Sequence, residues 1–125
     1  MVEKLIKEIV NSFDGLYYID KEDSGDGTLY DIGVSFLDTM TFDKADYLNW
    51  ENMLDSIDII TPNFQIYCSW DMSGYDYWTN RMEESNYTYI VVWVSNDFSD
   101  EDFKNLYNEI EKVYDELDNF NAYRK

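Results

Sequence analysis

The chain has no histidine, one cysteine and only nine basic residues among its 125. Without an imidazole, the side chain that most often transfers protons near neutral pH is missing, and Ser–His or Cys–His arrangements and histidine-based zinc sites cannot be assembled. The single cysteine, Cys68, cannot form an internal disulfide, which is typical of proteins in the reducing cytoplasm. We therefore expect a cytoplasmic protein without histidine-based catalysis.

Long apolar runs and phosphate-binding loops are also missing. No stretch approaches the roughly 18 apolar residues of a membrane span, and residues 1–7 mix charged and apolar side chains, unlike a signal peptide. Gly25 and Gly27 stand in an acidic turn that would repel a phosphate. We expect no membrane contact, and a binding function is favoured over an enzymatic one.

Acidic and aromatic side chains are in excess. Aspartate and glutamate number 27, the formal net charge is −18, and aromatic residues make up 18% of the chain. Solubility of a small domain needs a net charge of only about 2 to 8 in magnitude, and self-repulsion destabilises a compact state. Solubility and association with a partner both stay open as explanations of this excess.

The negative charge is spread along the chain. Residues 1–13 are neutral, 14–60 carry −10, and 61–98 and 99–125 carry −4 each. The longest run of consecutive acids is only three residues, whereas solvated tails come as longer runs of like charge. The pattern indicates a negative field on a folded surface.

Hydrophobic periodicity predicts three helices, at residues 2–13, 43–57 and 99–118, and four strands, at 16–19, 29–37, 64–70 and 87–94. Ser99 and Asp102 are spaced as a near capping box for the last helix. The order α-ββ-α-ββ-α predicts a single α+β domain over residues 1–125, a mostly antiparallel four-stranded sheet with the helices on one face. The last strand is apolar on both faces and is expected to be central.

Two patterns resemble chemical sites. Cys68 alternates with Ile66 and Trp70 on an apolar strand face, which favours a small core residue over a nucleophile. Residues 20–31 match an EF-hand loop at the first position and at the sixth, Gly25, but Asp31 stands where a bidentate glutamate belongs. Their flanks are strand-like, so an acidic hairpin turn is the favoured interpretation, and we expect no metal, cofactor or catalytic residue. A small calcium- or carbohydrate-binding module stays as an alternative.

The last predicted helix carries eight acids over residues 99–118. At about 1.5 Å per residue it is about 30 Å long, so an acid recurs about every 4 Å. One strand of duplex DNA carries a charge about every 3.4 Å. Lys104 and Lys112 reduce this to one net negative charge about every 5 Å. The density approaches that of one nucleic-acid strand, and such a surface could occupy a groove evolved for phosphates.

The candidate partner-binding residues are carboxylates and aromatic rings on the second helix and its flank, the 71–86 connection and the last helix. Such residues capture arginine and lysine through bidentate pairing and stacking, and tyrosine and tryptophan are frequent interface anchors. The rings of 71–86 could equally cover the sheet. The candidates are Asp43, Asp46, Glu51, Asp55, Asp58, Asp71, Tyr75, Asp76, Tyr77, Trp78, Glu83, Glu84, Glu111, Asp115 and Asp118.

In size, charge and aromatic content the whole chain resembles the small acidic inhibitors of phages and mobile elements, the DNA-mimic anti-restriction proteins and anti-CRISPR proteins. The resemblance implies a basic protein partner, a nuclease or CRISPR effector, whose nucleic-acid channel the acids would fill. An immunity protein that neutralises a basic toxin nuclease needs the same surface. Direct nucleic-acid binding is excluded as an interpretation because it requires a basic footprint.

Overall fold

The computed structural model describes residues 2–37, 44–72, 75–76, 81–82 and 86–124, with side chains for 2–37, 48–70 and 87–120. The helices are α1 (Val2–Asn11), α2 (Lys44–Ser56) and α3 (Asp100–Arg124), and a 3-10 turn, η1, covers Ser35–Leu37. The strands are β1 (Leu16–Asp23), β2 (Gly27–Val34), β3 (Asp58–Ile60), β4 (Phe64–Met72), β5 (Tyr75–Asp76), β6 (Arg81–Met82) and β7 (Asn86–Ser95).

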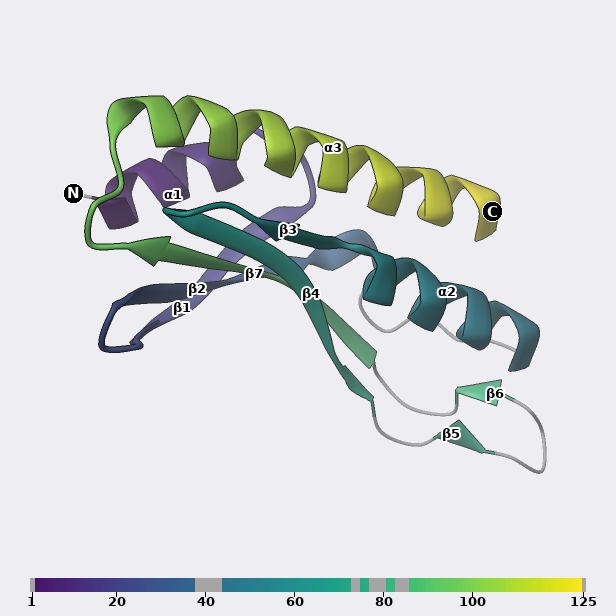
Figure 1. Ribbon diagram of the computed structural model, residues 1–125. Coiled ribbons are helices and arrows are strands. Elements are labelled where there is room, and N and C mark those ends of the chain that lie inside the picture. Colours follow the sequence, from purple (N-terminus) through teal and green to yellow (C-terminus); the bar gives the residue numbers. More distant parts are fainter. Residues whose placement is uncertain (1, 38–43, 73–74, 77–80, 83–85, 125) are drawn as a thin grey trace.

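The main sheet is antiparallel, has five strands, and follows the order β1-β2-β7-β4-β3 (Figure 1). The predicted α+β class and three helices are confirmed, but the prediction of four strands in the order α-ββ-α-ββ-α was wrong. The strand that was missed, β3, has three residues and follows α2 almost directly, so it is too short to show an alternating pattern. A separate pair, β5 and β6, lies within the expected 71–86 connection.

Strand β7 is the middle strand of the sheet, as its sequence predicted. It pairs with β2 along one edge and with β4 along the other. Ile90, Val92 and Val94 are buried toward the helices, and Val91, on the opposite face, is also 94% buried because strands flank it on both sides. An apolar run on both faces therefore marked the centre of the sheet correctly.

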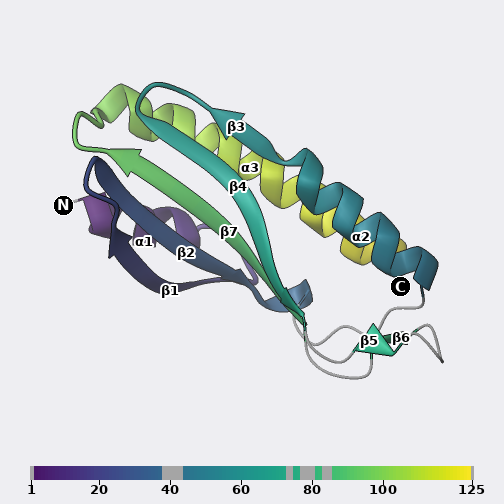
Figure 2. The same ribbon diagram turned by 60° about the horizontal axis from the view of Figure 1, so that its bottom comes forward.

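All three helices pack on one face of the sheet. Figure 1 shows α1 and α3 over the same side, and in the turned view of Figure 2 they lie behind the strands. One continuous core joins Ile6 of α1, Trp50 of α2 and Leu106 of α3 to Ile66 and Val92 of the sheet. The opposite sheet face is therefore uncovered by any described helix.

The predicted N-cap of α3 is confirmed. The Asp102 backbone N–H donates to Ser99 Oγ at 3.2 Å, and the Ser99 backbone N–H donates to Asp102 Oδ2 at 2.9 Å. Asn63, between β3 and β4, also donates to Asp102 Oδ2, at 3.0 Å. These hydrogen bonds hold the pKa of Asp102 below its ordinary value, and the bond from the Ser99 backbone N–H has the largest effect. The start of α3 is thus tied to the end of the sheet.

The hairpin of β1 and β2 is longer than predicted, because β1 continues through residues 21–23 of the expected turn. The turn itself narrows to 24–26, where Gly25 has a φ of 88° and donates its N–H to Asp23 Oδ1 at 2.9 Å. A left-handed residue of this kind favours glycine. The loop that partly matches an EF-hand is therefore two paired strands and a tight turn, without flanking helices.

Two leucines on α2 test this one-sided core. Leu54 is 1% exposed and Leu48 is 45% exposed. We expect Leu54→Ala to lower the free energy of unfolding by about 2–5 kcal/mol, because it leaves a cavity in the core. Leu48→Ala, the same change on the same helix, should cost less than about 0.5 kcal/mol. Urea denaturation of both variants measures the difference, and equal losses would contradict the placement of α2.

Candidate protein-binding surfaces

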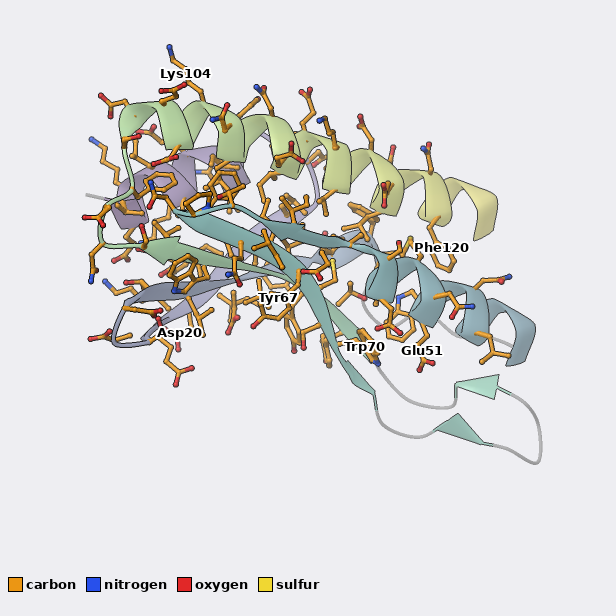
Figure 3. All side chains as sticks on the ribbon, in the orientation of Figure 1. Asp20, Glu51, Tyr67, Trp70, Lys104 and Phe120 are labelled. Carbon is orange, nitrogen blue, oxygen red and sulfur yellow. The ribbon has the colours of Figure 1, made fainter. Side chains whose placement is uncertain are left out.

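The candidate residues on α3 share one side of the helix. Glu111, Asp115 and Asp118 follow the spacing i, i+4, i+7 and are exposed, while Ile110 and Leu117 on the other side are buried. Figure 3 shows Lys104, which lies seven residues or about two helical turns before Glu111, pointing outward from α3. The helix therefore presents a solvated stripe that is mostly acidic and lies on the helical layer of the molecule.

The candidates that were expected on the second helix lie on two different elements, α2 and β3. Asp55 is exposed and Glu51 is half-buried on α2. Asp58 was considered with the second helix, but α2 ends at Ser56 and Asp58 begins the edge strand β3, opposite Tyr67 of β4. Its register places it on the sheet face turned away from the helices.

The structure locates the remaining candidates only in part. Asp43, Tyr77, Trp78, Glu83 and Glu84 lie outside the described residues. For the others only the backbone is described: Asp46 is in α2, Asp71 is in β4 opposite Tyr87, and Tyr75 and Asp76 form β5. Asp71 thus belongs to the main sheet and not to a loose connection.

The sheet face away from the helices, here called the open face, carries a row of rings that the sequence analysis missed. The register aligns Trp93 of β7 with Leu29 and Gln65, and Tyr89 with Gly33 and Ser69. The exposed rings of this face are 36–39% exposed: Tyr17, Tyr67 and Tyr87. Figure 3 shows Tyr67 on the side of the sheet opposite to α3.

Tyr17 is held flat on this face by its neighbour across the strands. It pairs with Gly33, and a Cβ atom added to Gly33 would lie 2.1 Å from the Tyr17 ring carbon Cζ. Only glycine leaves room for the ring at this position. Tyr17 thus adds a ring to the aromatic platform of the open face.

Acids stand on the same face. Asp20 of β1 pairs directly with Asp31 of β2, and Glu22 pairs with the adjacent Leu29. Partial burial raises the pKa of Asp31 above its ordinary value, and the charges of Asp20 and Glu22 raise it further. Like charges directly opposite in an antiparallel pair are destabilising. The fold therefore keeps an unfavourable cluster of carboxylates beside the rings.

A shallow hollow lies at one end of the open face. Its volume is about 320 Å³, and it is lined by Ser24, Asp26, Leu29, Gln65, Tyr67 and Trp93. The Trp93 indole Nε1–H donates to Asp26 Oδ1 at 3.3 Å, so an acid and a ring are joined at its wall. The open face combines apolar surface, aromatic rings and carboxylates around one concavity.

Few of the acids are neutralised inside the molecule. Where side chains are described, and Glu51 aside, the ion pairs use two acids: Glu3 binds Lys7 at 3.1 Å and Lys21 at 2.6 Å, and Glu109 binds Lys112 at 3.4 Å. Lys21 is the only basic residue in the five strands of the main sheet, and its bond to Glu3 turns it toward α1. No basic side chain of the described sheet stands on the open face.

Two further hollows, of about 370 and 220 Å³, lie between α3 and the segment 56–64. Both are lined by Glu109 and Lys112, which bind each other, and the smaller one also by Glu116. Neither glutamate was a candidate, although their spacing on α3 puts them beside its buried side. With a lysine in each lining, these hollows have mixed charge and suit a basic partner less well than the open face does.

Other chemistry finds little support in the residues described. Cys68 is buried in β4, as predicted for a core residue, and this burial raises its pKa to about 12. Within the described ranges, no group of three acidic, cysteine or histidine side chains is placed to hold a metal ion. No described helix combines the length and apolar character needed to cross a membrane.

Comparison of the chain with protein-family models, with curated proteins and with solved structures found no match.

The environment of Cys68 predicts its reactivity. Because its pKa is about 12 and its side chain is buried, almost none of the reactive thiolate forms near pH 7.5. We expect iodoacetamide to modify the native protein at least about a hundredfold more slowly than the protein in denaturant, by mass spectrometry. Equal rates would show that β4 opens readily and would contradict the buried position of Cys68.

Proposed function

We propose that this protein is a non-catalytic inhibitor that binds the basic nucleic-acid-binding surface of another protein and excludes its nucleic acid. Among such inhibitors, the size, charge and aromatic content of this chain fit an anti-defence protein best, with a restriction nuclease or CRISPR effector as the target. The observation that carries the proposal is the acidic surface of the described residues, whose ion pairs, Glu51 aside, use only Glu3 and Glu109. A partner of opposite charge would relieve the repulsion that this surface sustains.

The shape of α3 supports the same function. The helix spans 25 residues, which is about 37 Å of axis. Its exposed acids include Asp100, Glu101, Glu111, Asp115 and Asp118. From Asp100 to Asp118 these acids extend over about 27 Å of the helix axis, so they offer a basic cleft a row of negative charges, as a phosphate backbone does. It would steer a basic cleft toward the molecule from a distance.

Capture from lysate tests the proposal. The immobilised protein is exposed to nuclease-treated host lysate at about 0.05 M and about 0.5 M salt, since screening weakens steering and surface ion pairing. We expect capture of a basic nucleic-acid-binding protein at low salt, and at least about tenfold less capture at high salt. The captured protein should lose its binding to nucleic acid when the inhibitor is added. Capture of a toxin nuclease would indicate an immunity protein instead. A partner that still binds its nucleic acid normally would contradict the proposal.

The role of α3 is tested by association kinetics with the captured partner. We expect the triple variant Glu111→Lys, Asp115→Lys and Asp118→Lys to slow association about tenfold or more at low salt, while dissociation changes less than about threefold. The difference in association rate should disappear at high salt. A matched control is Lys104→Glu, which adds negative charge to the same side of α3 and should speed association. Unchanged rates in both variants would show that α3 does not steer the partner.

A further inference from the structure

We propose that the open face of the sheet is the docking surface, and that it takes an arginine-bearing segment of the basic partner. This inference rests on the proposed function and adds to it the surface and the chemistry of the segment bound. The rings would stack on guanidinium groups while neighbouring carboxylates accept their hydrogen bonds.

The exposed apolar surface of the described residues concentrates here. Tyr17, Tyr67 and Tyr87 are exposed on this face, and Ile60, at its β3 edge, is 68% exposed. Isolated exposed apolar residues need no explanation, but a group of them that spans β1, β4, β7 and β3 marks an interaction site. Ring-rich platforms provide much contact area with few rotatable bonds.

The carboxylates of the open face favour a bound segment that is positively charged. Asp20, Glu22 and Asp31 stand together at the β1 side of the platform, and Asp58 stands at the β3 side. A cation placed among the first three would relieve their mutual repulsion, which adds to the effect of partial burial in raising the pKa of Asp31. A second copy of this chain would instead place carboxylates against carboxylates, and each of the two copies carries a net charge of −18. Charge complementarity therefore points to a basic partner segment and against self-association.

Arginine fits this surface better than lysine. Its planar guanidinium stacks on tyrosine and tryptophan and forms two parallel hydrogen bonds to one carboxylate, whereas lysine offers a strongly hydrated point charge. The hollow of about 320 Å³ places Trp93, Tyr67 and the Asp26 carboxylate around one space. That combination of flat rings and a carboxylate is what a guanidinium requires.

The test uses oligo-arginine and oligo-lysine peptides of equal length, added to the ¹⁵N-labelled protein at low salt. We expect the arginine peptide to bind more tightly and to shift the amide signals of Asp20, Asp31 and Tyr67 and the indole signal of Trp93. Signals of Glu111, Asp115 and Asp118 on α3 should move much less. Shifts confined to α3, or no binding of the arginine peptide, would overturn the assignment of the open face.

Two neutralising variants separate a binding role from a structural one. Asp31→Asn should weaken the arginine peptide about tenfold and raise the melting temperature by up to about 4 °C, because it removes the repulsion from Asp20. Asp118→Asn, the same change on α3, should alter peptide affinity less than about twofold. Tyr67→Thr, which keeps a strand-forming residue, should reduce binding of the arginine peptide more than that of the lysine peptide. Equal effects of Asp31→Asn and Asp118→Asn would overturn the inference.

The same variants in the lysate experiment distinguish this inference from the proposed function. If Asp31→Asn and Tyr67→Thr capture the basic partner as well as the unaltered protein does, the open face is not the docking surface although the inhibitor function stands. If the unaltered protein captures no basic protein, the proposed function itself fails. Loss of capture in the two variants alone supports both.

Discussion

The three described helices of this protein bury one face of an antiparallel sheet and leave the other without a helix, and most other features of the described chain follow from that arrangement. Strand β7 lies in the middle of the sheet, where Ile90 and Val92 contact the core that α1, α2 and α3 complete. Because the core is one-sided, alternate residues of every strand must face outward. In most such sheets these residues are polar, whereas here they include Tyr17, Tyr67 and Trp93.

The distribution of charge follows from the same arrangement. The helical layer carries exposed acids along α3, and the open face carries Asp20, Glu22 and Asp31 beside the rings. These two sets are suited to different tasks, since remote charges change association rates and charges in contact determine what stays bound. In our account, α3 attracts a basic partner and the open face holds it. The repulsion between Asp20 and Asp31, which costs the free protein stability, is relieved in the complex.

The sequence predicted the elements with strong periodicity and missed the features that depend on pairing. The helical face of α3, its Ser99 cap, the core position of Cys68 and the central place of β7 all follow from local patterns. Strand β3 was too short to be recognised, and the pairing of Asp20 with Asp31 depends on a register that no local pattern determines. The rings of β7 were visible, but its two apolar faces predicted burial on both sides. The signal of a binding face that the sequence offered was the number of aromatic residues at the strand positions that alternate with the core residues, such as Tyr17, Tyr67 and Trp93.

Zero-length carbodiimide cross-linking of the inhibitor–partner complex tests the central claim most directly, because it joins carboxylates to lysines that touch them. Basic binding segments usually contain lysine as well as arginine, and the described open face has no lysine of its own with which to react. The account predicts cross-links from Asp20, Glu22 or Asp31 to a nucleic-acid-binding segment of the partner. Cross-links to the partner from the acids of α3 alone, with those three residues unmodified by any partner lysine, would contradict it.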